Sequence, residues 1–213
     1  MKIDILTLFP NMFETIFNES IIKRAINENK AEINIHDFRT YSTDPHHKVD
    51  DMVLTCQPIF DCVEVLKTPN TKVILLTPDG NPYKQQTAYN LAKEDHIILI
   101  CGHYEGFDDR IRTICDLEIS IGDYVLTGGE LASMVITDSI IRLLPGVIEE
   151  GSHINDSFNN NLLDYPTYTK PRVFRGLEVP EVLLSGDHKK IEEYRMQESL
   201  KKTMEKRPDL LEK

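Results

Sequence analysis

Short apolar runs alternate with amphipathic segments through the first 146 residues, and this alternation limits the possible folds more than any other feature. The run at 96–101 is apolar at nearly every position, as in a strand that is buried on both faces. Segment 57–66 instead places Ile59, Val63 and Leu66 at helical spacing. The sequence predicts strands at 2–9, 31–36, 72–76, 96–101 and 116–119, and helices at 57–66, 87–93, 108–115 and 130–144. Such alternation favours an α/β fold with a mostly parallel sheet and helices on its faces.

Turn and cap residues mark several boundaries between these elements. Pro10 ends the first strand, and Asn11 is expected to cap a helix because Glu14 follows three residues later. Pro78-Asp79-Gly80 is expected to form the turn after the third strand. Pro145-Gly146 ends the long apolar helix.

The chain changes character after this last boundary. Residues 147–163 show no periodicity and include three consecutive asparagines, so we predict a flexible linker there. The tail contains a long charged segment, 188–206, that is typical of a solvated helix. We therefore predict an α/β domain at 1–146, the linker, and a small α-helical C-terminal domain at 164–213.

The charge of the chain restricts how it can bind nucleic acid. Its 213 residues carry a formal net charge of −11 at pH 7. A protein that holds nucleic acid by bulk charge alone is basic, so an RNA-binding function has to depend on shape and local patches. One such patch lies at 164–176, where Lys170, Arg172 and Arg175 stand against a single acid, Asp164.

Several features favour a cytoplasmic location. No apolar run approaches the roughly 18 residues needed to cross a bilayer. The opening run Lys2–Leu6 contains an acid and is typical of a strand rather than a signal peptide. The four cysteines lack the two-residue spacing of zinc and redox sites, so we expect free thiols in a reducing compartment.

Three glycine-containing segments follow successive predicted strands: 76–80, 102–106 and 120–130. Open α/β sheets bind ligands just beyond the carboxyl ends of their strands. In the third segment Tyr124-Val125-Leu126 lies between glycines, which suits an apolar adenine pocket. The chain has no dinucleotide fingerprint, phosphate loop or zinc-protease motif, which argues against a dehydrogenase or nucleotidase. We predict a ligand that is held mainly by backbone contacts.

Longer strings make a resemblance specific, and together they span nearly the whole chain. They are I-L-T-L-F-P near the start, G-H-Y-E-G-F-D-D-R (102–110), S-I-G-D-Y-V-L-T-G-G-E-L (120–131), R-L-L-P-G-V (142–147), D-S-F (156–158), L-L-D-Y-P-x-Y-T-K-P (162–171) and V-L-L-S-G-D-H (182–188). In this order they resemble the bacterial tRNA (guanine-N1)-methyltransferases that modify position 37, a family of the SPOUT, or trefoil-knot, class.

The resemblance implies a fold, a cofactor and an assembly. The family's α/β domain contains a deep trefoil knot, an exception to the rule that chains do not thread loops. The three glycine segments would form this knot and grip S-adenosylmethionine, in a homodimer whose active sites lie at the subunit interface. The implied cofactor contacts and their neighbours are Leu76, Pro78, Gly102, Tyr104, Gly106, Ile121, Gly122, Asp123, Tyr124, Val125, Leu126, Gly128 and Gly129.

The resemblance also assigns catalysis to Asp156 and Arg142, and chemistry agrees. Guanine N1 carries a proton at neutral pH, and an aspartate within hydrogen-bond reach can accept it as general base. Negative charge then builds toward O6, where an arginine can stabilise it. The ordinary readings are a helix cap for Asp156 and a helix-dipole partner for Arg142.

Further residues are candidates for contacts to the substrate. Glu105 in the second segment is expected to approach the target guanine or Mg²⁺, and Asp164 is a candidate of the same kind. Mg²⁺ is expected from the resemblance alone, because no residue cluster marks its site. Lys170 and Arg172 are candidate phosphate contacts to a tRNA with guanine at position 37, which the C-terminal domain would bind. We read the neighbouring His103 as a surface residue.

The chain departs from the family's pattern in two places. A glycine-rich stretch that the family carries is missing between Asp51 and Met52, and Asp156 lies about one residue closer to Arg142 than usual. One explanation is deletion; the other, which we favour, is that the sequence omits residues of a loop that is disordered without ligand. The second predicts an Asp51–Met52 Cα separation far above 3.8 Å.

Three alternatives to this function stay open. In the first, the chain is a SPOUT methyltransferase that acts on another RNA, although the 142–147 and 156–158 strings favour guanine N1. In the second, it is an RNA-binding protein that keeps the knot and binds S-adenosylmethionine without transferring a methyl group. In the third, it is a doubly wound enzyme with another cofactor, which predicts a glycine fingerprint after the first strand, where Pro10-Asn11-Met12-Phe13 stands instead.

Overall fold

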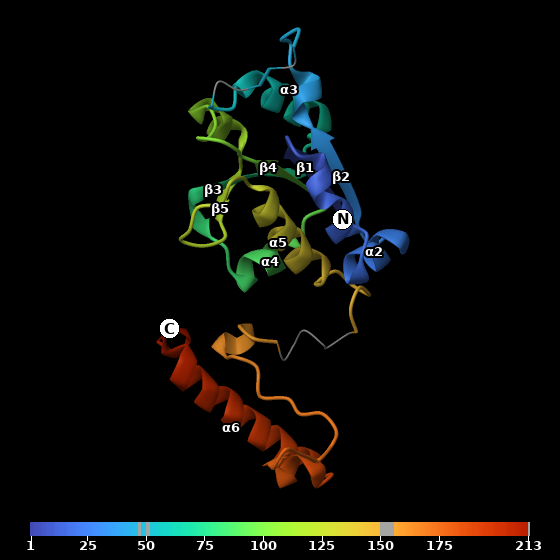
Figure 1. Ribbon diagram of the computed structural model, residues 1–213, viewed down its shortest axis with the longest axis vertical. Helices are drawn as coiled ribbons and strands as arrows, with labels where there is room; N and C mark the ends of the chain where they lie inside the picture. The colour runs from blue at the N-terminus through green and yellow to red at the C-terminus, as the bar shows by residue number, and fades with distance from the viewer. Residues whose placement is uncertain (47, 50–51, 150–155, 213) are drawn as a thin grey trace. The chain divides into compact units, whose positions relative to one another are not determined.

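The structure, a computed structural model, describes residues 1–46, 48–49, 52–149 and 156–212. The chain divides into two compact units, residues 1–150 and 151–213, which we call unit 1 and unit 2 and describe separately (Figure 1). The core of unit 1 reaches Val147, the first residue of the predicted linker, which is buried. The division into 1–146, 147–163 and 164–213 stays a prediction. The Asp51–Met52 separation lies outside the described residues.

A parallel sheet forms the centre of unit 1. Its strands in the described residues are β1 (Lys2–Thr7), β2 (Glu32–Asp37), β3 (Thr71–Pro82), β4 (His96–Cys101) and β5 (Leu117–Ser120). Their order across the sheet is β2-β1-β4-β3-β5, and each neighbouring pair is parallel. β3, which contains the first glycine segment, therefore lies between β4 and β5, which precede the second and third segments.

The helices of unit 1 are α1 (Glu14–Phe17), α2 (Ser20–Asn27), α3 (Cys56–Leu66), α4 (Gln85–Leu91) and α5 (Glu130–Ile141), with 3₁₀ helices at Pro10–Phe13, Phe38–Tyr41 and Asp109–Ile114. They cover both faces of the sheet, with α3 on one side and α2, α4 and α5 on the other (Figure 1). Unit 1 thus has three layers, and the predicted α/β class with a mostly parallel sheet is confirmed.

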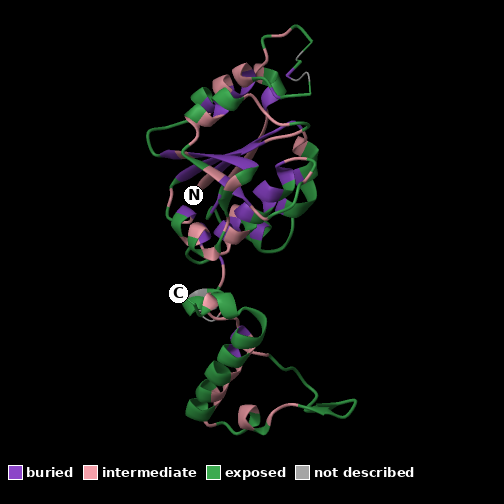
Figure 2. Ribbon diagram, turned by 90° about the vertical axis from the view of Figure 1, so that its left-hand side faces the viewer, coloured by how far each residue is buried: buried purple, intermediate pink, exposed green. Residues whose placement is uncertain are grey.

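Successive residues along a strand belong to two hydrophobic cores, one on each face of the sheet. In β4, Ile97 and Leu99 pack with α5, whereas Ile98 and Ile100 pack with α3. All six residues of β4 are buried, which explains why its sequence is apolar without a period of two. Figure 2 shows the buried residues concentrated in this sheet and in the helix faces against it.

A buried polar cluster surrounds Asp4 inside the sheet. Its side chain is fully buried and lies 2.6 Å from His96 Nε2, 2.9 Å from His36 Nε2 and 3.1 Å from Lys2 Nζ. The other nitrogen of His96 lies 2.7 Å from the Thr71 hydroxyl. Burial alone would raise the pKa of the Asp4 carboxyl, but the hydrogen bonds of its partners outweigh burial and lower it.

The predicted turn at Pro78-Asp79-Gly80 is wrong. These residues lie within β3, at a shift of register in which Leu76 and Asn81 both pair with Ile119 of β5. Gly80 makes the irregularity possible, because a Cβ there would lie 2.6 Å from the Ile119 backbone. The pairing that carries the chain on as a strand comes from residues about forty positions away, so the local turn pattern could not reveal it.

Two predictions about helix boundaries also need correction. Asn11 does not cap a helix, because the 3₁₀ helix begins one residue earlier at Pro10, whose fixed φ suits a first helical position. The helix predicted at 108–115 is a 3₁₀ helix, Asp109–Ile114, and the Asp108 side chain caps it by accepting from the Arg110 N–H over 3.0 Å.

Unit 2 contains a hairpin and one long helix. Its elements are β6 (Val173–Phe174), β7 (Leu177–Glu178) and α6 (His188–Lys206), with 3₁₀ helices at Asn159–Asn161, Glu181–Leu184 and Pro208–Leu210. The chain at 163–164 runs along α6: Leu163 N donates to the Thr203 hydroxyl over 2.9 Å, and Lys202 Nζ donates to the Asp164 carbonyl over 2.8 Å. Most of α6 is otherwise exposed (Figure 2).

The knot and the helical C-terminal domain stay predictions. Among the described residues, the structure contains no helix that is both long enough and apolar enough to cross a membrane.

Candidate functional site

The three glycine segments meet at one cavity of about 440 Å³ in unit 1. The second and third segments leave β4 and β5 at their carboxyl ends, where parallel sheets commonly bind ligands, and the first lies within the irregular part of β3 between those strands. The volume lies within the usual range for sites of small molecules and cofactors. Its lining residues are Val53, Leu76–Asp79, Gly102–Phe107, Asp109, Arg112, Ile119–Gly122, Tyr124–Gly129 and Ala132.

Nearly all the predicted cofactor contacts line this cavity. The exception is Asp123, which is not part of the wall. Glu105, the candidate substrate contact, belongs to the wall as well. The structure thus gathers residues that the sequence spreads over more than fifty positions; their contact with a cofactor stays a prediction.

The second and third segments are joined directly by their backbones. Gly129 N donates to the Gly102 carbonyl over 2.8 Å, and His103 and Gly128 form a single antiparallel bridge. A Cβ at Gly129 would lie 2.8 Å from Cys101 Cα. These glycines are therefore required because two backbones approach closely.

The chain just after Asp51 backs the second segment. The Glu105 N–H donates to the Met52 carbonyl over 3.0 Å, and Leu54 N donates to the Gly106 carbonyl over 2.9 Å. Val53 between them lines the cavity. Met52 directly follows the point at which we expect the glycine-rich stretch to be missing. Its carbonyl is thus hydrogen-bonded to the cavity wall.

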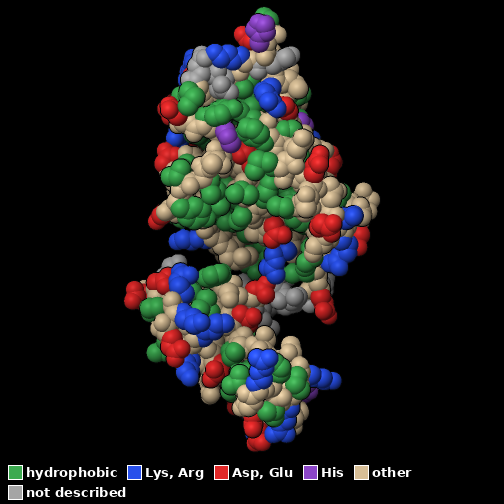
Figure 3. Space-filling model, viewed as in Figure 1, with side chains coloured by type: hydrophobic (Ala, Val, Ile, Leu, Met, Phe, Trp, Pro, Cys, Tyr) green, Lys and Arg blue, Asp and Glu red, His purple; other side chains and the backbone are tan. Residues whose placement is uncertain are grey.

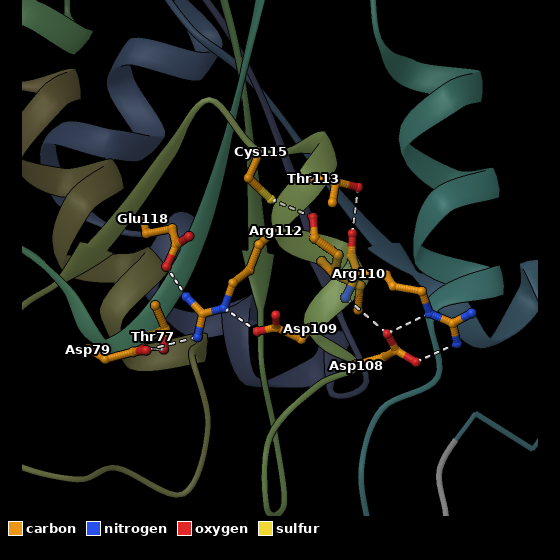
Figure 4. A network of polar contacts seen from close by, with 10 residues as sticks. Thr77, Asp79, Asp108, Asp109, Arg110, Arg112, Thr113, Cys115 and Glu118 are labelled. Atoms are coloured by element: carbon orange, nitrogen blue, oxygen red, sulfur yellow. Dashed lines mark hydrogen bonds and ion pairs between the residues drawn. The ribbon is translucent and has the colours of Figure 1, made fainter.

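Arg112 ties three parts of the wall together, as Figure 4 shows. Its guanidinium donates to Asp109 Oδ1 over 2.8 Å, to Asp79 Oδ2 over 2.8 Å, and to Glu118. It also stands 5.2 Å from the centroid of the Phe107 ring. Arg112 therefore holds the first segment, the 3₁₀ helix 109–114 and β5 to one another.

This network changes the acidity of its members. The hydrogen bond from Thr77 and the positive charge of Arg112 lower the pKa of the Asp79 carboxyl. Burial lowers the pKa of the Arg112 guanidinium, but Asp109, Asp79 and Glu118 outweigh burial and raise it. Both shifts favour the charged forms of Asp79 and Arg112, so this pair is ionic at neutral pH.

A second polar group beside the cavity was missed by sequence reasoning. Glu130 begins α5 and is buried, with Thr7 donating to its Oε1 over 2.8 Å. Its Oε2 lies 3.6 Å from Nδ1 of His103, which lines the cavity. The available signal was the position of Glu130, an acid that starts an apolar helix directly after two glycines.

Apolar side chains are exposed on α5 and on the third segment. Leu131 and Val135 are each 48% exposed, and Val125 is 84% exposed. Figure 3 shows hydrophobic side chains gathered over this part of unit 1. Exposed apolar side chains gathered in this way are typical of an interaction surface.

The predicted catalytic pair is divided between the two units. Arg142 follows the last residue of α5 in unit 1, and its N–H donates to the Asp138 carbonyl over 3.2 Å. Asp156 lies in unit 2, where it is partly buried. Neither residue is without a partner, and their joint action stays a prediction.

The remaining candidates lie in unit 2. Asp164 is partly buried: its N–H donates to the Ser157 hydroxyl over 3.0 Å, and its Oδ1 has no hydrogen-bond partner among the described residues. Arg172 is exposed and donates to Glu181 over 3.0 Å, and Lys170 is exposed as well. Arg175 stacks on Phe174, 5.2 Å from the ring centroid. No group of three or more His, Cys, Asp or Glu side chains in the described part of the chain is arranged to hold a metal ion.

Comparison with known proteins gives a single family. The family described as tRNA (Guanine-1)-methyltransferase TrmD matches residues 1–213. A tRNA (guanine-N(1)-)-methyltransferase of Shouchella clausii (strain KSM-K16) is 53% identical over 99% of this chain and 91% of its own. Proteins of the same name from Bacillus cereus (strain AH820) and Bacillus anthracis (strain A0248) are each 54% identical over 100% of this chain and 92% of theirs.

The aligned region of these relatives is longer than this chain. The alignment with the Bacillus cereus protein runs over 225 positions, 12 more than the 213 residues of this chain, so the relative has residues that this chain lacks. This agrees with a stretch missing from this sequence. A match over the whole length, with more than half of the residues identical, shows that the chain belongs to the tRNA (guanine-1)-methyltransferase family TrmD.

Proposed function

We propose that this protein transfers a methyl group from S-adenosylmethionine to N1 of guanine 37 in tRNA. The observation that carries the proposal is the cavity at which the three glycine segments meet, in a chain of this family. The position of the guanine beside the anticodon rests on the resemblance of the sequence motifs.

The residues of the cavity fit S-adenosylmethionine. The volume of about 440 Å³ suits a ligand of this size. Tyr124, Val125 and Leu126 offer an apolar wall to a purine, and the glycines of the wall carry no side chain that would keep a ligand away from the backbone. When bound, the cofactor supplies an electrophilic methyl group on its sulfonium.

The protein's own residues then handle the proton and the charge on guanine. Asp156 accepts the N1 proton as general base, which leaves N1 with a lone pair for attack. The Arg142 guanidinium stabilises the negative charge that develops toward O6. The remaining requirement is an in-line arrangement of N1 with the methyl group, which the walls of the cavity provide.

The substrate and the assembly complete the proposal. Glu105 in the cavity wall approaches the target guanine or Mg²⁺, and Asp164 acts in the same way from unit 2. Lys170 and Arg172 contact tRNA phosphates. The active form is a homodimer, supported by the exposed apolar side chains on α5 beside the cavity. We propose a cytoplasmic location from its tRNA substrate.

The test is methyl transfer to unmodified tRNA. The protein is incubated with methyl-labelled S-adenosylmethionine, Mg²⁺ and a tRNA that carries guanine at positions 36 and 37. We expect label at N1 of guanine 37. Asp156→Ala should lower the rate roughly 100-fold or more, because a positioned general base contributes about that factor.

Two controls keep the result specific. Asp209→Ala removes an exposed aspartate of the same unit and should leave the rate within about twofold. A tRNA with adenine at position 37 should accept no label. Label on another nucleotide would overturn the proposed position, and cofactor binding without any transfer would overturn the proposed activity.

A further inference from the structure

Glu130 is a buried acid whose surroundings the proposed reaction does not explain. The residue is only 2% exposed, although a carboxylate is costly to bury unless it is hydrogen-bonded or paired. Thr7, at the end of β1, donates its hydroxyl to Glu130 Oε1 over 2.8 Å. The same hydroxyl accepts the N–H of Phe9 over 2.9 Å, so its own proton is directed to Glu130.

The other oxygen of Glu130 faces His103. Oε2 lies 3.6 Å from His103 Nδ1, a buried atom with no hydrogen-bond partner in the described residues. A carboxylate only accepts hydrogen bonds, so the pair is favourable when Nδ1 carries a hydrogen. The imidazole is also held by two rings, Phe9 at 4.6 Å and Tyr104 at 4.7 Å between centroids.

The rest of the imidazole belongs to the cavity. His103 lines the wall and its side chain is 17% exposed. Nδ1 is buried, whereas the other ring nitrogen, Nε2, is not among the buried atoms without a partner in the described residues, so we assign the Nε2 edge to the cavity. With the hydrogen on Nδ1, a neutral ring offers Nε2 to the cavity as an acceptor.

Gly128 shows that the approach of the two side chains is closely fitted. A Cβ on this residue would overlap both Oε2 of Glu130 and Nδ1 of His103. Gly128 also forms the backbone bridge to His103. The side-chain pair and the backbone bridge thus fasten the second glycine segment to the third at the same place.

We infer that Thr7 and Glu130 are positioning residues that fix the imidazole of His103, so that its Nε2 edge contacts the cofactor in the cavity. The inference rests on the proposed function, because it takes S-adenosylmethionine as the ligand. Thr7 orients Glu130, Glu130 sets the tautomer and place of His103, and the two glycine segments are held together before the ligand arrives.

The first experiment removes one hydroxyl outside the cavity. Thr7→Val keeps the shape of the side chain and loses the donor to Glu130, whereas Thr7→Ser keeps the donor. Binding of S-adenosylmethionine alone is measured by calorimetry on the full chain, without RNA. We expect Thr7→Val to weaken binding roughly tenfold, and Thr7→Ser to stay within about threefold of the wild type.

The chain offers a matched control for this change. Thr137 is also a fully buried threonine, and its hydroxyl has no hydrogen-bond partner in the described part of the structure. Thr137→Val should leave the affinity unchanged. In tRNA assays Thr7→Val should raise the KM for the cofactor and leave kcat within about twofold, since the lost contact acts on binding. Equal affinity of Thr7→Val and wild type would overturn the inference.

The second experiment reads the imidazole directly. Nitrogen chemical shifts of His103 in the ¹⁵N-labelled full chain, taken where the ring is neutral, should show the hydrogen on Nδ1. Glu130→Gln presents an amide that can donate, so the hydrogen should move to Nε2. Adding S-adenosylmethionine to the wild type should shift the Nε2 signal. The inference would be overturned by a wild-type ring that carries its hydrogen on Nε2, or by an Nε2 chemical shift that does not change when the ligand is added. Both results are independent of how well the Thr7 variant folds.

The outcomes separate this inference from the proposed function. If the wild type binds no S-adenosylmethionine, both fail. If it binds and methylates guanine 37 while the Thr7 and Glu130 variants behave as the wild type, the inference fails and the proposed function stands.

Discussion

Arg112 donates from Nη2 to Asp79 Oδ2 over 2.8 Å and so joins two parts of the cavity wall that lie 33 residues apart in the sequence. The same guanidinium holds Asp109 and Glu118, and no other side chain in the described residues contacts all three acids. We expect Arg112→Gln to weaken binding of S-adenosylmethionine by about three- to tenfold, because the first segment and β5 lose their common partner.

Arg110 provides the matched control for Arg112. It lies two residues away and pairs with Asp108 over 2.6 Å, and it does not line the cavity (Figure 4). Arg110→Gln should leave cofactor affinity within about twofold in the same titration. Equal losses in the two variants would contradict a specific role for Arg112.

Gly80 offers a test of the irregular part of β3. Its φ lies outside the left-handed region, so alanine fits the backbone conformation and would slightly stabilise an open turn. In the structure, however, a Cβ would lie 2.6 Å from the Ile119 backbone. We expect Gly80→Ala to lower the free energy of unfolding by about 1–3 kcal/mol, as overpacking does. Urea unfolding measures this free energy. An unchanged or higher stability would mean that residues 78–80 form an open turn and not a continuation of β3.

The buried Asp4 predicts how stability depends on pH. Its folded pKa is lowered, so its contribution is fully present above the unfolded value of 3.8 and is lost as pH falls further toward the folded value. Asp4→Asn should cost about 2–4 kcal/mol at pH 7, because it leaves His36 and His96 without their charged partner. The difference from the wild type should shrink below about pH 4 in urea unfolding.

The control for Asp4 is Asp108, whose pKa is lowered to about 2 by the hydrogen bonds of Arg110 at the surface. Asp108→Asn should have a much smaller effect on stability, because water screens that pair. A pH-independent difference between Asp4→Asn and the wild type would show that the carboxylate charge is not what stabilises the cluster.

Thiol chemistry tests the packing behind the cavity. Burial, with the nearby Glu130 carboxylate, raises the pKa of the Cys101 thiol, and burial raises that of Cys62 to about 12. Iodoacetamide at pH 8 should therefore leave both residues unlabelled in the native protein and label them in urea. Peptide mass spectrometry locates the label. Native labelling of Cys101 would mean that the end of β4 opens.

Local pattern was enough for the elements whose own residues determine them. The bounds of β4 and α6 agree with the prediction, because β4 is apolar at every position after His96 and α6 has a capping Asp187 and a long charged run. The second and third glycine segments were also found where the sequence placed them, because they follow β4 and β5 of the parallel sheet.

Long-range contacts were not visible in the sequence. The continuation of β3 depends on Ile119, and the importance of Arg112 depends on acids from three segments. His103, which we expected to be a surface residue, lines the cavity beside the buried Glu130. A local sequence pattern does not show that the hydroxyl of Thr7 will donate a hydrogen bond to Glu130, 123 residues away. Such residues are therefore found only from the folded structure.

The bond between Thr7 and Glu130 has a consequence for the synthesis of this protein. It joins residues 123 positions apart, and the wall of the cavity extends to Ala132 at the start of α5. A chain growing on the ribosome therefore cannot complete the cavity until α5 has emerged. Cofactor binding can stabilise the nascent protein only after about two thirds of it has been made, so the earlier strands must avoid aggregation without help from the ligand.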